Sequence, residues 1–222
     1  MALVGIGGIG KTSLADASIR TVIKQYTFQR VVWERCPDIG AGGGNWTWLS
    51  RALLAKMNVD ESLLEGSETQ LFQRLKETLK ALPTLVVIDN LEANLSQSGL
   101  LQYLTELTNP SKFLLTTRTR LPTSAFSRNI VLGELTKASA LALIRNQAGH
   151  IGVTELADAS ETQLMPIYEA VGGNPLALKL IIGLAAVLPL PEILADLAEA
   201  RSQAIEGLYR HIYHKAWHTL SE

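Results

Sequence analysis

The first half of the chain shows two kinds of hydrophobic pattern, one typical of strands and one typical of amphipathic helices. Short segments that are typical of strands lie at residues 2–5, 30–36, 84–90, 112–118 and 129–132. The segment 84–90 contains a continuous apolar run that ends in an acid, as a buried parallel strand does. Amphipathic segments lie between the expected strands, at residues 11–26, 45–57, 67–82 and 100–107. In the third of these segments Leu71, Leu75 and Leu79 recur at helical spacing, and Asn45 is placed to cap the second. Strands that alternate with helices predict an α/β fold with a parallel sheet covered on both faces.

After about residue 132 the strand pattern stops. Four helical segments follow at residues 136–149, 160–173, 174–188 and 191–203, separated by glycine and proline. We therefore expect an α/β domain at residues 1–133 and a small helical domain at residues 134–203.

Composition narrows the possible partners. The chain has 222 residues, of which 47% are hydrophobic, and its 20 Lys and Arg nearly balance 21 Asp and Glu. This balance gives no electrostatic reason to expect nucleic acid or an anionic membrane as a partner. The most apolar stretch, Leu176 to Leu190, contains Lys179 and is shorter than the roughly 20 residues that span a bilayer. A single cysteine, Cys36, is typical of a reducing compartment, so we expect a cytoplasmic protein without a membrane segment.

The strongest local motif is GIGGIGKTS, which has the Gly-x4-Gly-Lys-Thr spacing of a P-loop, between a strand and a helix. Its glycines let backbone N–H groups surround phosphates, while the lysine supplies a positive charge and the threonine hydroxyl a ligand for Mg²⁺. We call the segment from Gly5 to Thr12 the phosphate loop. It predicts a P-loop NTPase that binds a nucleotide with Mg²⁺. The expected nucleotide-binding residues here are Gly5, Ile6, Gly7, Gly8, Ile9, Gly10, Lys11, Thr12 and Ser13.

A phosphate loop also needs an acid for the metal, supplied by the end of a neighbouring strand. Asp89 follows four apolar residues and is the expected Mg²⁺ residue beside Thr12. Many P-loop hydrolases carry a second acid next, which polarises the attacking water, but this chain has Asn90, whose amide cannot take a proton. Glu92 is the nearest alternative base, although its position favours a solvent-facing loop acid slightly over that role. Slow hydrolysis is therefore expected.

Two further segments bear on the nucleotide. KFLLTTRTR ends a strand that we expect beside the strand of the phosphate loop, so that Arg118 can reach the γ-phosphate; Arg120 is the competing candidate. GGNPLALKL has the glycines of a helix end, then Asn174 as a cap and Pro175 in the first turn of the next helix. By itself this second segment is adequately explained as a helix junction.

The order of GIGGIGKTSLA, VVWERC, LVVIDNLE, KFLLTTRTR and GGNPLALKL resembles the NB-ARC class of STAND ATPases, the signal-transduction ATPases with numerous domains. The resemblance implies phosphate binding by Gly5–Thr12, a Mg²⁺ role for Asp89 and a sensor role for Arg118. It also implies that Pro175, with Leu176 beside it, packs on the adenine. Residues 204–222 resemble the first helix of a winged-helix domain. The resemblance further implies that ATP or ADP is the bound nucleotide, that ADP holds a closed monomer, and that exchange for ATP permits self-association.

The sequence leaves three functions open. The first is a nucleotide-controlled switch with weak Mg²⁺-dependent ATPase activity. The second is a constitutive ATPase, an AAA-like motor or loader, which needs a second acid where Asn90 stands. The third is a module that binds nucleotide without hydrolysing it. Turnover measurements separate them.

Overall fold

The computed structural model describes residues 1–25, 28–37, 46–91, 100–122 and 128–200, with backbone only for residues 100–101 and 196–200. These residues form two compact units. The first contains residues 1–7 and 11–132, and the second contains residues 8–10 together with the described residues from 133 on. Asn45, Glu92 and the segment 204–222 lie outside the described residues.

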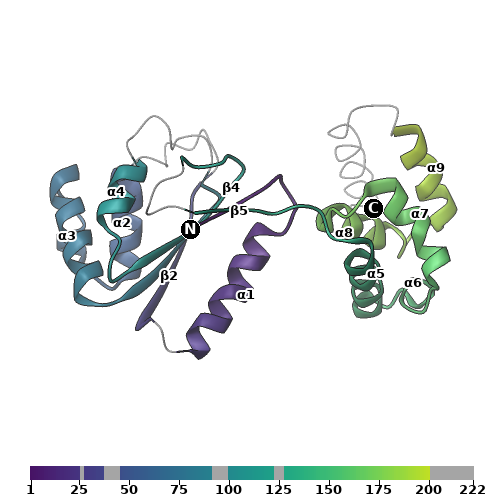
Figure 1. Cartoon of the computed structure of the whole chain (residues 1–222), viewed down its shortest axis with the longest axis horizontal. Coiled ribbons are helices and arrows are strands. Elements are labelled where there is room, and N and C mark those ends of the chain that lie inside the picture. Colours follow the sequence, from purple (N-terminus) through teal and green to yellow (C-terminus); the bar gives the residue numbers. More distant parts are fainter. Residues whose placement is uncertain (26–27, 38–45, 92–99, 123–127, 201–222) are drawn as a thin grey trace. The chain divides into compact units, whose positions relative to one another are not determined.

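The first unit is built on a five-stranded sheet (Figure 1). Its strands are β1 (Ala2–Val4), β2 (Arg30–Arg35), β3 (Thr84–Asp89), β4 (Lys112–Thr117) and β5 (Asn129–Val131). Every pair of neighbouring strands is parallel. All six residues of β3 are buried, as its continuous apolar run predicts. The α/β fold with a parallel sheet is therefore confirmed.

The strand order is β2-β3-β4-β1-β5. It confirms that the strand before Arg118 lies beside β1, since Leu3 pairs with Thr116 and Val4 with Thr117. The expectation that Asp89 ends a neighbour of β1 is wrong, because β4 lies between β3 and β1. Asp89 must therefore reach the phosphate loop past the end of β4.

Helices cover both faces of the sheet (Figure 1). Helix α1 (Lys11–Lys24) packs Ala15 and Ile19 against one face, with Leu3, Val87 and Leu114. The other face carries the apolar sides of α2 (Trp46–Lys56), α3 (Glu68–Ala81) and α4 (Leu100–Glu106). A short 3₁₀ turn, η1 (Glu61–Leu63), precedes α3. Both faces of the central strands β3, β4 and β1 are thus largely removed from water, as in a parallel sheet, whereas Ile130 and Val131 of the edge strand β5 are exposed.

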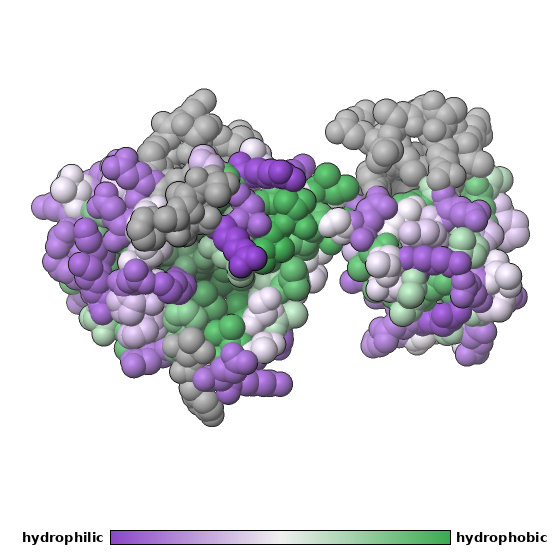
Figure 2. All heavy atoms as spheres, in the orientation of Figure 1, coloured by the Kyte–Doolittle hydropathy of each residue, from purple (hydrophilic) through white to green (hydrophobic). Residues whose placement is uncertain are grey.

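Helix α3 shows how local sequence fixes these elements. Ser67 caps it by accepting the N–H of Gln70, whose side chain accepts the N–H of Ser67 in return. The expected apolar stripe of Leu71, Leu75 and Leu79 is buried, and the opposite surface of α3 is hydrophilic (Figure 2). Capping and periodicity together explain where this helix begins and which side it buries.

The second unit is helical. It contains α5 (Lys137–Ile151), α6 (Thr154–Ala157), α7 (Glu161–Val171), α8 (Pro175–Leu184) and α9 (Leu190–Ala200). Its core is aliphatic and draws on each helix, with Ile144, Leu156, Leu164, Ile181 and Ile193 among the buried residues. None of the helices among the described residues has the length and apolar character needed to cross a membrane.

Candidate functional site

The phosphate loop connects the end of β1 to the start of α1. Its first N–H, from Gly5, donates to the carbonyl of Thr117 at 3.2 Å and ties the loop to β4. Gly8 and Gly10 have φ values of 73° and 100°, in the left-handed region that side chains other than glycine seldom adopt. Ile6 is exposed and Ile9 is buried. The glycines at these positions are therefore required by the backbone path.

Lys11, the first residue of α1, folds back over the loop. Its ammonium donates to the carbonyls of Gly5 at 2.8 Å and Ile6 at 2.9 Å. The N–H groups of the first helical turn, which includes Thr12 and Ser13, have no partner within the helix and carry its positive dipole end. The loop, the ammonium and the helix end together provide donors and positive potential for an anion.

Asp89 is the buried acid of this edge, with only 3% of its surface exposed. Its Oδ1 accepts the hydroxyl of Thr12 at 2.8 Å and the hydroxyl of Thr116 at 2.6 Å. The structure thus joins the end of β3 to the start of α1 and the end of β4. Thr116 was missed as a member of the site by sequence reasoning. The available signal was its position as a polar residue ending an apolar run, as Asp89 ends the run of β3.

The oxygen donors fit a magnesium ion. The other oxygen of Asp89, Oδ2, accepts no hydrogen bond from a described residue, and the hydroxyl of Thr12 lies beside the same carboxylate. Mg²⁺ prefers such hard oxygens and keeps several waters, so it needs few protein ligands besides substrate phosphates. Within the described ranges no three His, Cys, Asp or Glu residues cluster as a metal site. Thr12 and Asp89 would hold the ion here.

Asn90 follows the acid with φ of 61°, a left-handed conformation that asparagine tolerates. Its side-chain amide donates to the carbonyl of Cys36 at 3.4 Å. Burial, together with the negative charges of Glu34 and Asp89, raises the pKa of the Cys36 thiol to about 12. At neutral pH this thiol is protonated, which is typical of a buried structural cysteine and not of a nucleophile.

The side chain of Arg118 reaches the phosphate loop. A Cβ built on Gly7 would lie 3.9 Å from the guanidinium carbon and from Nη2 of Arg118. The chain leaves β4 one residue earlier, at Thr117, so β4 delivers both this guanidinium and the hydroxyl of Thr116 to the site. Arg120 is exposed in the segment that follows.

Pro175 and Leu176 open α8 in the second unit and are described within that unit. The buried side chain of Asn174 caps the helix by accepting the N–H groups of Leu176 at 3.0 Å and Ala177 at 3.2 Å. The preceding turn is fixed by Glu134, whose carboxylate accepts the N–H of Gly173 at 3.1 Å. The expected glycine, asparagine and proline arrangement of this helix start is therefore present.

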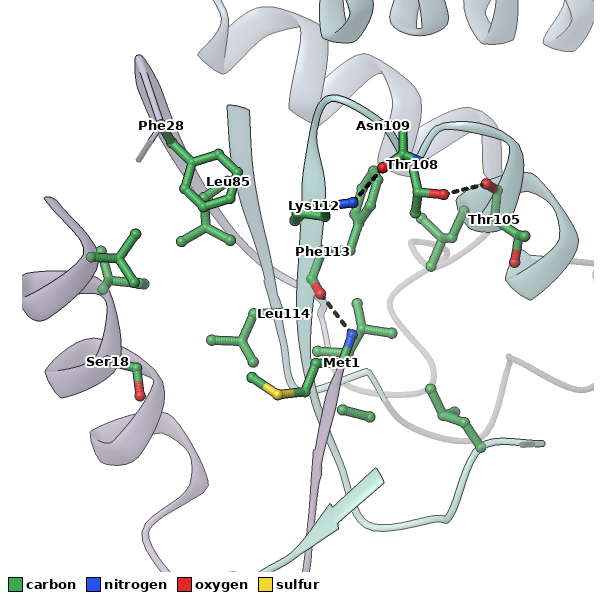
Figure 3. A pocket seen from close by; sticks show the side chains of 16 residues that line it. Met1, Ser18, Phe28, Leu85, Thr105, Thr108, Asn109, Lys112, Phe113 and Leu114 are labelled. Carbon is green, nitrogen blue, oxygen red and sulfur yellow. Dashed lines mark hydrogen bonds between the residues drawn. The ribbon is translucent and has the colours of Figure 1, made fainter. Parts of the chain in front are cut away.

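A cavity of about 500 Å³ lies at the amino ends of the parallel strands, which we call the amino edge of the sheet (Figure 3). The carboxyl ends of the strands, beside the phosphate loop, form the carboxyl edge. The walls of the cavity are mainly apolar and include Ala2, Leu85 and Phe113. On its rim Lys112 donates to the side chain of Asn109. Its lining reaches Ala2 on β1 and Leu115 on β4 but includes no residue of the phosphate loop and neither Asp89 nor Arg118. The cavity is thus not part of the site built from Lys11, Thr12 and Asp89.

Comparison with known families decides where the chain belongs. The model of the NB-ARC domain matches residues 1–152. The chain belongs to the NB-ARC family. The matched range contains the phosphate loop, Asp89 and Arg118, whereas Pro175 lies beyond it. The NB-ARC family is one of P-loop ATPases, and the expected membership is therefore confirmed.

Solved structures share the fold of this NB-ARC chain. A STAND protein with a tetratricopeptide repeat sensor from Pyrococcus horikoshii has a TM-score of 0.61 and 19% identity, and the match covers 96% of this chain and 30% of that one. The Walker-type ATPase of Pyrococcus abyssi has a TM-score of 0.59 and 13% identity, with 97% and 71% covered.

The ORC2 protein of Aeropyrum pernix in its ADP form has a TM-score of 0.59 and 14% identity, with 96% and 61% covered. The match to the STAND protein covers 30% of that protein, so the chain spans less than a third of its length. Identities this low establish the shared fold. No curated protein matched the sequence.

Proposed function

We propose that this NB-ARC chain is an ATP- and ADP-binding switch with weak, Mg²⁺-dependent ATPase activity. The observation that carries the proposal is the 2.8 Å bond from Thr12 of the phosphate loop to the buried Asp89, with an amide residue directly after the acid. This arrangement offers binding for phosphate and metal. Asn90 offers no base for the attacking water, so that bound nucleotide persists.

Each residue has a distinct role in the proposal. The backbone of Gly5–Gly10 cradles the phosphates, and Lys11 exchanges its two loop carbonyls for β- and γ-phosphate oxygens. Arg118 reports the γ-phosphate through a charge-assisted bond. Pro175 packs on the adenine, with Leu176 beside it. A magnesium ion held by Thr12 and Asp89 would neutralise phosphate charge. Asn90 and Glu92 stay candidates for contacts to the attacking water.

The proposal extends to organisation and partners. Residues 1–133 form the nucleotide-binding domain, residues 134–203 the helical domain, and residues 204–222 begin a winged-helix domain. In the cytoplasm, ATP favours self-association through the nucleotide-binding domain and so transmits a signal. Support comes from the family and from the fold shared with a STAND protein, whose name describes signal transduction.

The test is to purify the chain, extract bound nucleotide and follow multiple-turnover hydrolysis with Mg²⁺. We expect co-purified ADP and turnover far below the enzyme median of about 10 per second. A Lys11→Ala variant purified in the same way controls for adventitious nucleotide. Sustained turnover near that median would contradict the switch and favour a constitutive ATPase. Binding without any hydrolysis would favour a non-hydrolysing module.

A further inference from the structure

Thr116 holds three consecutive residues at the end of β3. Its hydroxyl donates to Oδ1 of Asp89 at 2.6 Å and accepts the N–H of Asn90 at 2.9 Å. Its carbonyl accepts the N–H of Leu91 at 2.8 Å. The left-handed conformation of Asn90 lets these successive N–H groups both turn toward β4. One residue therefore fixes both the acid and the backbone that follows it.

The orientation of the Thr116 hydroxyl is fixed by its two hydrogen-bond partners. Only 1% of this residue is exposed, so water does not compete for the hydroxyl. The N–H of Asn90 occupies a lone pair, which directs the single hydroxyl proton to Asp89. The hydroxyl of Thr12 donates to the same oxygen, so Oδ1 of Asp89 accepts two hydrogen bonds. Oδ2 of Asp89 accepts no hydrogen bond from a described residue.

We propose that Thr116 is a positioning residue for the divalent cation: it orients the carboxylate of Asp89 so that one oxygen is bound internally and the other is presented to the metal. This inference rests on the proposed function. The same strand carries Arg118 two residues later, beside Gly7 of the phosphate loop.

The test compares variants by the Mg²⁺ concentration that gives half-maximal enhancement of ATP binding, measured by calorimetry. Thr116→Val keeps the shape and removes the hydroxyl. Groups that orient a metal ligand typically change metal affinity by 10–100-fold, so we expect this concentration to rise by at least about tenfold. ADP affinity in EDTA should stay within about twofold, because Lys11 and the loop are unchanged. Thr116→Ser should restore the wild-type Mg²⁺ dependence.

Thr117→Val is the matched control. Thr117 is the neighbouring buried residue, and its hydroxyl accepts the N–H of Thr119 at 3.1 Å instead of bonding Asp89. We expect this variant to keep the wild-type Mg²⁺ dependence. If Thr116→Val does not fold, Thr116→Cys, with its weak S–H donor, replaces it and should give a smaller shift in the same direction.

The possible failures are distinguishable. A wild-type chain that binds neither ADP nor ATP in EDTA would overturn the proposed function, and this inference with it. Normal nucleotide binding with unchanged Mg²⁺ dependence in the Thr116 variant would overturn only the positioning role. Equal loss of affinity with and without Mg²⁺ would also overturn it, because a general structural defect predicts that result.

Discussion

At the carboxyl edge of the sheet, Thr116 binds its buried hydroxyl to the carboxylate of Asp89. At the amino edge, Ser111 is equally buried, but its hydroxyl donates to the carbonyl of Leu79 at 2.6 Å and accepts the N–H of Thr84 at 2.9 Å. Both partners of the Ser111 hydroxyl are backbone groups, and these hydrogen bonds leave no charged group to bind a ligand. The buried carboxylate of Asp89, by contrast, carries a negative charge and has a second oxygen, and both favour the binding of a cation.

The amino edge also has the cavity of about 500 Å³, but its walls are mainly apolar. The carboxyl edge has the phosphate loop, the ammonium of Lys11 and the guanidinium of Arg118. Open volume alone therefore does not favour the amino edge as the binding site. The buried carboxylate of Asp89 beside the start of α1 supports the carboxyl edge as the proposed site.

The largest expected effect comes from Lys11→Ala. It removes the ammonium that lies over the loop, so ATP and ADP affinity should fall by about 100-fold or more, since hydrogen bonds to charged groups are among the strongest. Calorimetric titration measures the loss. An unchanged ATP affinity would refute the phosphate loop as the binding site and remove the basis of the comparison.

Arg118→Ala should lower the affinity for ATP more than the affinity for ADP. If the guanidinium beside Gly7 meets the γ-phosphate, ATP affinity falls about tenfold while ADP affinity changes little. Competition binding of the two nucleotides gives the ratio. Arg120→Ala is the matched control and should leave the ratio unchanged; the opposite pattern would assign the sensor to Arg120.

Ser111→Ala tests the amino edge. It leaves the buried N–H of Thr84 without its acceptor, so the free energy of unfolding should fall by about 1–3 kcal/mol. Urea denaturation measures this loss. Nucleotide affinity and its Mg²⁺ dependence should remain at wild-type values. A nucleotide-binding defect in a folded Ser111→Ala protein would show that the two edges are not functionally separate.

The smallest effect is expected from Asn90→Asp. The substitution adds a proton acceptor after Asp89 without touching the phosphate loop, so ADP affinity should stay within about twofold and turnover should rise a few-fold. Single- and multiple-turnover assays measure it. A sharp fall in turnover would instead show that the amide of Asn90 contributes directly to hydrolysis.

Local signals predicted most of the fold. The phosphate loop between β1 and α1 followed from glycine and lysine spacing, and the buried stripe of α3 followed from leucine periodicity. The short helix α6 was missed because four residues give almost no periodicity. The strand order depends on contacts between distant segments, so the insertion of β4 between β1 and β3 was not predictable from local pattern.

The site was predictable in its parts but not in its connections. Lys11, Thr12 and Asp89 carry chemistry that the sequence shows directly. Thr116 does not, because a threonine at a strand end is ordinary and its partner Asp89 is 27 residues away. Only the fold shows that the hydroxyl meets a buried carboxylate.

Hydrogen–deuterium exchange of the wild-type chain, with and without ADP and Mg²⁺, compares the two edges in one experiment. If nucleotide binds at the carboxyl edge, amide exchange slows in peptides covering residues 5–13, 89–91 and 116–118, and stays unchanged in residues 104–112 of the amino edge. Slowed exchange confined to residues 104–112, or none in the phosphate loop, would contradict the account.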